Sequence, residues 1–316
     1  MPSDLQTGRQ IRRPDLFRIL CGVASVATVA TLVWMIFEIA RQSTPAIGKF
    51  GLGFLFDSKW QPNRDIYGVL PFLLGTGVTS LIAILFALPL GLAVAIFLSE
   101  DFLPSAARQF IRFTVEMLAA IPSVVYGLWG IFVIVPLIRQ FGMWAVKAFK
   151  GVPLLGTIFA PPAYPNSILT ASLVLALMIL PTITAISRAA LVAVPATLRE
   201  GSYALGATRW ETIFGVLLPT AAPGIVAATI LALGRAMGET MAVAMLIGNS
   251  TRFTGSLLSP GGTLASLLAN QFGEAVDLQV ASLMYAALIL MALTLFVNMA
   301  GEAVLRYTQR QTAGIR

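Results

Sequence analysis

The sequence contains no histidine and a single cysteine, Cys21, in 316 residues. Without histidine, the chain has no imidazole metal ligand, no histidine general base and no Ser-His-Asp triad. A single cysteine excludes an intrachain disulfide and a cysteine metal cluster. These absences exclude most enzyme mechanisms, so we expect a chain that is not an enzyme and holds no cofactor of its own.

Charged residues are also scarce. Lys, Arg, Asp and Glu make up 11% of the chain, whereas soluble domains carry about 25%. Hydrophobic residues make up 57%, and the mean hydropathy is +0.85. The net charge is +7, but the basic residues do not cluster as they do in nucleic-acid-binding proteins. So few charges could not cover the core of a soluble domain of this length, and the composition predicts an integral membrane protein.

Long apolar runs are what the sequence does contain. A membrane-spanning helix needs about 20 predominantly apolar residues. The first such run is longer than the apolar region of a signal peptide, about 7–15 residues, so we expect an uncleaved anchor helix. The predicted fold class is an all-α polytopic membrane protein with six transmembrane helices. The six runs are 17–40, 68–98, 113–138, 167–187, 220–247 and 280–305.

The loops predict an orientation. Loops on the side of the N-terminus carry more arginine and lysine than the alternate loops, which predicts that both termini are cytoplasmic. Among the outer loops, 41–66 and 139–166 are rich in glycine, proline and aromatic residues and predict ordered caps. Apolar residues at helical spacing in 263–276 predict a short amphipathic helix on the outer membrane interface, with a solvated loop as the alternative.

Two charges lie deep inside the fifth run, in the segment GRAMGET. An arginine at mid-bilayer costs about 2.5–3.5 kcal/mol, so it persists where it faces a partner or a water-filled cavity. The i, i+4 spacing places Arg235 and Glu239 on one helix face, where they can neutralise each other. We interpret them as candidate residues of a substrate pathway for an anion, with an ion pair that only fixes packing as the alternative. Gly234 and Gly238, at GxxxG spacing, would let another helix approach closely.

The segment 194–219 mixes charged and apolar residues between the fourth and fifth runs. Gly206 predicts a turn between two short helices. A connection of this length is long for a structureless linker, and its mixed surface is typical of a docking element.

Within this segment, residues 200–219 resemble the EAA loop of ABC importer permeases. That motif reads Glu-Ala-Ala, three residues, Gly, nine residues, then Ile-x-Leu-Pro. The spacing matches throughout, although Gly201 and Ser202 replace the alanines and Val216 replaces the isoleucine. Over about residues 67–305, the segments GVLPFLLGTGVTSLIA, MILPTITAISRAAL, ALGATRWETI and RAMGETMAVAMLIGN resemble the PstC-type phosphate permeases, which have the MetI-like fold with an additional N-terminal helix.

The resemblance implies an organisation and a set of partners. Residues 1–66 would hold a cytoplasmic tail, the first transmembrane helix and an outer loop, and 67–305 a five-helix permease core with its coupling loop at about 195–219. Residues 306–316 would form a cytoplasmic tail. The implied assembly is a phosphate importer of the bacterial inner membrane, with a second, PstA-type permease subunit, two PstB-type ATPase subunits and an extracytoplasmic PstS-type phosphate-binding protein.

The resemblance also implies roles for individual residues. Arg235 and Glu239 would lie on the phosphate pathway. ATP and Mg would bind to the ATPase subunits, since this chain lacks the GxxxxGK[ST] loop that cradles nucleotide phosphates. The residues implied to contact the ATPase are Glu200, Ala204, Leu205, Gly206, Ala207, Arg209 and Trp210.

Other interpretations remain open from the sequence. The companion PstA-type permease shares the arginine–glycine–glutamate element but usually continues differently from 240–243. A permease for sulfate or molybdate would share the docking segment. A secondary transporter driven by an ion gradient would show an inverted repeat with paired broken helices, and the two halves show no such correspondence. A membrane enzyme would need a nucleophile–base set that is missing.

Overall fold

The structure is a computed structural model that describes residues 16–100 and 102–313. Within these residues, six helical segments are long and apolar enough to cross a membrane, which confirms the predicted fold class. Most of the predicted runs coincide with these segments, and the third and fifth differ. The six segments are Phe17–Phe50, Leu70–Ser99, Ser123–Ala148, Ile168–Val192, Arg209–Gly238 and Asp277–Thr308.

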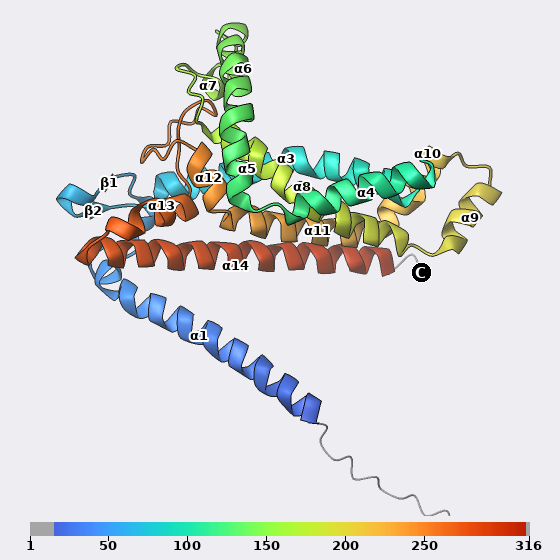
Figure 1. The fold of residues 1–316 in the computed structure, drawn as a ribbon, viewed down its shortest axis with the longest axis horizontal. Helices are drawn as coiled ribbons and strands as arrows, with labels where there is room; N and C mark the ends of the chain where they lie inside the picture. The colour runs from blue at the N-terminus through green and yellow to red at the C-terminus, as the bar shows by residue number, and fades with distance from the viewer. Residues whose placement is uncertain (1–15, 101, 314–316) are drawn as a thin grey trace, which may run out of the picture.

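Four long helices, α8 among them, form a bundle. Helices α3, α8, α11 and α14 run alongside one another, whereas α1 contacts α14 near the C-terminal end of α1 and then diverges from the bundle (Figure 1). Helix α8 packs on both α3 and α11, so it occupies the centre. The bounds are α1 Leu16–Phe50, α3 Leu70–Ser99, α8 Ile168–Val192, α11 Leu218–Gly238 and α14 Asp277–Ala313.

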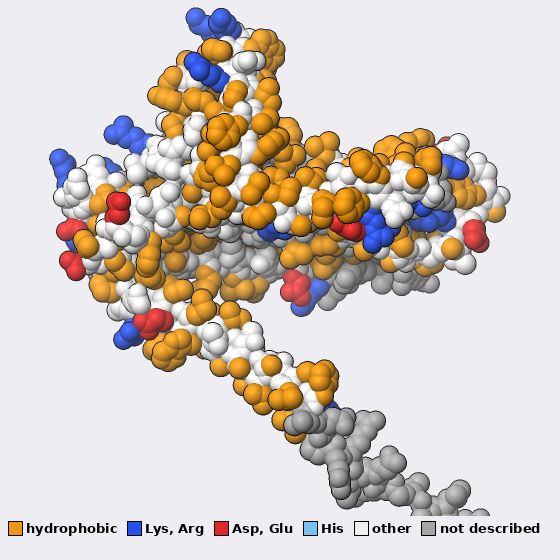
Figure 2. Space-filling model, viewed as in Figure 1, with side chains coloured by type: hydrophobic (Ala, Val, Ile, Leu, Met, Phe, Trp, Pro, Cys, Tyr) orange, Lys and Arg blue, Asp and Glu red, His pale blue; other side chains and the backbone are white. Residues whose placement is uncertain are grey.

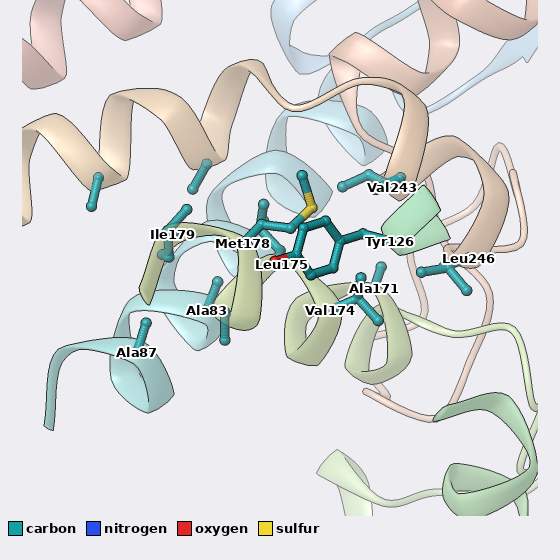
Figure 3. Close-up of a cluster of buried hydrophobic side chains, with 14 of the residues drawn as sticks. Ala83, Ala87, Tyr126, Ala171, Val174, Leu175, Met178, Ile179, Val243 and Leu246 are labelled. Carbon is teal, nitrogen blue, oxygen red and sulfur yellow. The ribbon is translucent and has the colours of Figure 1, made fainter. Parts of the chain in front are cut away.

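The largest buried cluster lies where α8 meets its neighbours (Figure 3). Val174 and Ile179 of α8 are fully buried against small residues, including Ala83 and Ala87 of α3. Small side chains let helix backbones approach closely, and dispersion contacts then stabilise the bundle where lipid provides no hydrophobic driving force between helices. Alanine is therefore as important to this core as the branched residues are.

The predicted third span is wrong in its position. The run 113–138 is not one helix, because α4 ends at Ala120 and a new helix begins at Ser123. Pro122 lies at this break, and proline disfavours helical geometry in the residue before it. Helices α5 and α6, joined by the π-helical turn η2, form a rod that projects from the bundle (Figures 1 and 2). The bounds are α4 Ser105–Ala120, α5 Ser123–Trp129, η2 Gly130–Ile134 and α6 Val135–Ala148.

The predicted fifth span is also displaced. Instead of 220–247, the helical segment begins at Arg209 and ends at Gly238, and a separate short helix follows. The π-helical turn η3 joins the short helix α10 directly to α11, so the three form one continuous helical segment. The bounds of these elements are α9 Ala196–Ala204, α10 Arg209–Thr212, η3 Ile213–Leu217 and α12 Met241–Leu246.

The end of the bundle opposite α9 and α10 carries a small cap (Figure 1). Phe54 stacks on Tyr285 of α14 with ring centroids 4.6 Å apart, and the Trp60 indole donates a hydrogen bond to Gln271 at 2.8 Å. The two strands pair antiparallel. The cap expected at 41–66 therefore exists, although its first ten residues continue α1. Its elements are α2 Gly53–Phe56, β1 Trp60–Gln61, the 3-10 turn η1 Pro62–Arg64 and β2 Ile66–Tyr67.

The helix predicted in 263–276 forms, but its apolar face is buried inside the protein instead of facing outward as in an interfacial helix. Leu264 and Leu267 of α13 are almost fully buried, and the helix packs on α3, α12 and α14. Thr263 and Ser266 form a reciprocal cap at its start, and the apolar face closes the bundle. In the second expected cap, 139–166, the residues up to Ala148 belong to α6. The remaining elements are α7 Leu155–Ile158, α13 Leu264–Gln271 and the 3-10 turn η4 Phe272–Glu274.

Candidate functional site

Arg235 lies in the last turn of α11, where the helix dipole favours a cation. Its side chain is exposed, and Nη1 donates a hydrogen bond to Thr182 Oγ1 of α8 at 3.3 Å. The guanidinium group is thus held against α8 at the end of α11, and part of it remains exposed on this side of the chain.

Glu239 is not on the same helix as Arg235. Helix α11 ends at Gly238, and Glu239 takes an extended conformation with φ −67° and ψ 125°. Its half-buried side chain instead accepts a hydrogen bond from the Ala242 amide at 3.5 Å, in the first turn of α12. The prediction that Arg235 and Glu239 share one helix face is therefore wrong, and the alternative of an ion pair that fixes packing is not seen either: the helix ends between the two residues, and they form no salt bridge among the described residues.

The break between α11 and α12 is itself informative. Gly238 is exposed, and Glu239 and Thr240 are half-buried. In a membrane protein, irregular backbone is tolerated where it is buried in protein or lines a water-filled cavity. Half-buried non-helical backbone beside an exposed arginine therefore indicates a polar path or a partner subunit on this face. Broken helices of this kind often supply ion and anion sites in transporters.

The two glycines that flank Arg235 differ in their surroundings. A Cβ atom at Gly234 would lie 3.1 Å from Oδ1 of Asn298 on α14, whereas at Gly238 no neighbouring atom would lie within 4 Å. The close approach of a second helix therefore occurs at Gly234. At Gly238 no such neighbour is present among the described residues, and the helix ends there.

The segment 194–219 has the two short helices and the turn that its sequence predicts. Helix α9 ends at Ala204, and Gly206 has φ +84°, a left-handed conformation that favours glycine. Thr208 and Glu211 then form a capping box that starts α10, with the Thr208 amide donating to Glu211 Oε2 at 2.7 Å. The segment is thus a rigid helix–turn–helix, which we call the docking segment, residues 196–212.

The docking segment lies at one end of the molecule (Figure 1). Leu205, at the turn, is 91% exposed, and Trp210 is half exposed. Leu205 lies outside the six segments that can cross a membrane, so its exposure marks a protein contact rather than a solvated loop. Of the residues implied to contact the ATPase, Ala207 is half-buried. The exposed ones are Glu200, Ala204, Leu205, Gly206, Arg209 and Trp210.

Several residues around these sites were not singled out from the sequence. Thr182 belongs to MILPTITAISRAAL, a segment that the sequence marks, but nothing local identifies the threonine as a partner of Arg235. Tyr126 follows the break at Pro122, and its hydroxyl donates a hydrogen bond back to the Leu118 carbonyl of α4. The ion pair between Glu100 and Arg199, described below, joins positions far apart in the chain, and only the position of Glu100 at the end of an apolar run hints at it.

These features together define a class of protein: a polytopic helical membrane protein with a broken helix, an arginine at the break and an exposed helix–turn–helix at one end. Residues 87–310 match the family described as "Binding-protein-dependent transport system inner membrane component". The chain therefore belongs to this family of membrane transport permeases.

Curated relatives cover nearly the whole chain. The "Phosphate transport system permease protein PstC" of Mesorhizobium japonicum is 40% identical over 284 residues, covering 89% of this chain and 86% of that protein. The protein of the same name from Xylella fastidiosa is 38% identical and covers 98% of both. Among solved structures, an inward-facing form of the MetNI methionine ABC transporter superposes with a TM-score of 0.54 at 21% identity, covering 76% of this chain and 94% of that one. The last similarity concerns the fold alone.

Proposed function

We propose that this chain is a transmembrane subunit of an ATP-driven importer of inorganic phosphate in the bacterial cytoplasmic membrane. The observation that carries the proposal is the exposed Arg235 at the end of a broken helix, in a chain that is 38–40% identical to phosphate permeases over most of its length. A phosphate anion needs a cation along any path through a low-dielectric layer, because an unpaired charge is costly there.

Arg235 and Glu239 would then have opposing effects on the anion. The guanidinium group can bind two phosphate oxygens at once through its planar fork of N–H donors. Glu239, separated from Arg235 by the helix break, places a negative charge next to the path and would weaken the hold on phosphate. An attraction with a nearby repulsion suits a pathway, where the anion must leave as well as enter. Thr182 fixes the guanidinium group from α8.

The docking segment supports a partner ATPase. This chain has no phosphate-binding loop of its own, and its exposed apolar turn at Leu205 and Gly206 fits a groove on another protein. In this proposal ATP and Mg bind to two ATPase subunits, a second permease subunit completes the pathway, and an extracytoplasmic binding protein delivers phosphate. This chain would bind no cofactor.

The orientation follows from the docking segment. The C-terminal end of α14 lies toward the end of the molecule that bears α9 and α10, and the β1–β2 cap lies at the opposite end (Figure 1). If the docking segment contacts an ATPase in the cytoplasm, the C-terminus is cytoplasmic and the cap is extracytoplasmic. An even number of spans then places the N-terminus in the cytoplasm too, as the arginine and lysine distribution predicts.

The test is uptake of radiolabelled phosphate into vesicles that contain this chain with a candidate second permease, ATPase and binding protein. We expect uptake only when ATP is present on the side of the vesicle membrane where the ATPase binds. We expect excess sulfate or molybdate not to compete with phosphate. Uptake without ATP or without the ATPase would overturn the proposal. Transport of sulfate in preference to phosphate would favour the oxyanion alternative.

A further inference from the structure

The docking segment is held by a part of the chain to which it is not directly joined. Glu100, the residue after the end of α3, is buried, and its Oε1 lies 3.0 Å from Nη2 of Arg199 on α9. Arg199 also donates a hydrogen bond from Nη2 to the carbonyl of Leu191 in α8 at 3.4 Å. A charge pair this shielded from water is screened less by salt than the exposed pairs of this chain.

The second docking helix is attached at the same place by aromatic contacts. Phe102 stacks on Trp210 of α10 with ring centroids 5.2 Å apart and an interplanar angle of 27°. Phe102 also lies 5.4 Å from the ring of Phe97 in α3, and the Arg209 guanidinium is 5.9 Å from the Phe102 ring. Beneath these contacts is a buried apolar cluster. Its members include Ala95, Ile96, Leu191, Val194, Ile213 and Leu217.

From this attachment, α4 leads toward the pathway residues. Helix α4 begins at Ser105, soon after Phe102, and its 16 residues span about 24 Å. Near its far end the Leu118 carbonyl accepts a hydrogen bond of 2.8 Å from the Tyr126 hydroxyl of α5, and α5 packs on α12, which follows the break after Arg235. Figure 1 shows α4 extending from near α10 to α5.

Helix α4 has the properties of a movable rod. None of its residues is buried, although it contacts α8 and α3. Few buried contacts give a segment low local stability, so it can shift without unpacking the core. The central helix α8, by contrast, is too deeply packed to move alone.

We propose that Glu100 and Phe102, which we call the α3–α4 latch, carry movement of the docking segment into α4, through it to Tyr126 of α5, and from α5 to the broken helix α11–α12 that bears Arg235. This route would act beside the covalent links from the docking segment to α8 and α11. The proposal rests on the proposed function, since it assumes an ATPase on the docking segment. The latch would supply a coupling free energy between the docking segment and the pathway at the helix break, and substitutions in the latch should reduce that energy.

The experiment measures phosphate imported per ATP hydrolysed, using the complete reconstituted complex and the variants Glu100→Gln and Phe102→Ala. We expect both variants to assemble and to hydrolyse ATP, with the import-to-hydrolysis ratio reduced about fivefold or more, as loss of a typical coupling energy would give. The reversed pair, Glu100→Arg with Arg199→Glu, should recover part of the ratio. Tyr126→Phe, at the other end of α4, should lower it as well.

The matched control is Glu116→Gln. Glu116 lies in α4 and forms an ion pair with Arg112 at 2.8 Å. This pair is exposed and does not involve the docking segment. We expect its import-to-hydrolysis ratio to equal that of the wild type. An equal fall in Glu116→Gln would mean that any loss of charge near α4 has this effect, and would overturn the proposal.

Two further outcomes also overturn it. If Glu100→Gln and Phe102→Ala assemble and keep the wild-type ratio, the contacts only hold the structure together. If these variants lose the ATPase from the complex, the latch supports docking rather than transmission. Failure of the wild-type complex to import phosphate with ATP is a different result, because it contradicts the proposed function itself.

Discussion

Helices α1 and α8 have the same mean hydropathy in their most apolar windows, 2.2, yet none of the α1 window is buried inside the chain and 72% of the α8 window is. Hydropathy therefore reports that a helix suits the membrane and does not report its neighbours. Large apolar residues of α1, such as Leu32 and Trp34, face outward, where lipid or a partner subunit would cover them. The apolar residues of α8 face other helices of this chain. The two helices give matched positions for testing what burial contributes.

The largest expected difference concerns function. Arg235 bonds to α8, and Arg41 of α1 forms an exposed pair with Glu38 at 2.8 Å. We expect Arg235→Ala to reduce phosphate uptake about tenfold to a hundredfold, the loss of one charge-assisted contact of about 1.5–3 kcal/mol. Arg41→Ala should leave uptake unchanged. Both are measured as ATP-dependent uptake at equal amounts of assembled complex. Normal uptake by Arg235→Ala would reduce this residue to a packing role.

The next difference concerns packing. Leu175 of α8 is 1% exposed, and Leu32 of α1 is 55% exposed. The same substitution, Leu→Ala, should lower the free energy of unfolding by about 2–5 kcal/mol at position 175, because it leaves a cavity. At position 32 we expect a change close to zero. Thermal unfolding of the purified chain in one detergent measures both. Equal destabilisation would show that α1 is packed on something in the purified protein.

The sequence predicts that α1 and α8 exist, but it does not predict how deeply each is buried. Apolar length predicts both helices, since the cost of exposed backbone in lipid imposes long helices. It does not separate α1 from α8, because burial inside the bundle depends on which faces meet. The same limit applies to Pro122: it is visible in the sequence, but the run 113–138 stays apolar across it, so hydropathy alone joins two helices that the proline separates.

The candidate site also has parts that local sequence predicts and parts that depend on long-range contacts. The docking segment follows from local chemistry, since Gly206, Thr208 and Glu211 each act on their immediate neighbours. Arg235 stands out because a charge within an apolar run is rare. Its true partner, Thr182, lies 53 positions away, and Glu239 was assigned to it by helix spacing that the chain does not keep. Long-range contacts and helix ends are the parts that a single sequence leaves undetermined.

A smaller difference concerns glycine. A Cβ atom at Gly91 of α3 would lie 3.0 Å from Cγ2 of Ile183 on α8, whereas at Gly22 of α1 no neighbouring atom lies within 4 Å. Gly91→Ala should lower the free energy of unfolding by about 1–3 kcal/mol through overpacking. Gly22→Ala should raise it by about 0.5–1 kcal/mol, because alanine is the better helix former. Opposite signs in the same thermal assay are the expected result, and a stabilised Gly91→Ala variant would mean that α3 and α8 can separate without cost.

The smallest difference concerns hydroxyl groups. Thr184 of α8 donates across helices to the Gly91 carbonyl at 3.3 Å, and Thr28 of α1 donates to the Ala24 carbonyl of its own helix at 2.9 Å. Hydrogen bonds between membrane helices average about 0.6 kcal/mol in double-mutant cycles. Thr184→Val should therefore lower the free energy of unfolding by about that amount. Thr28→Val should lower it less, because the Ala24 carbonyl still accepts its backbone hydrogen bond within the helix. If Thr28→Val is the more damaging of the two in the thermal assay, the bond that joins α3 to α8 contributes nothing beyond packing, and the buried hydroxyl of Thr184 is held there for its shape alone.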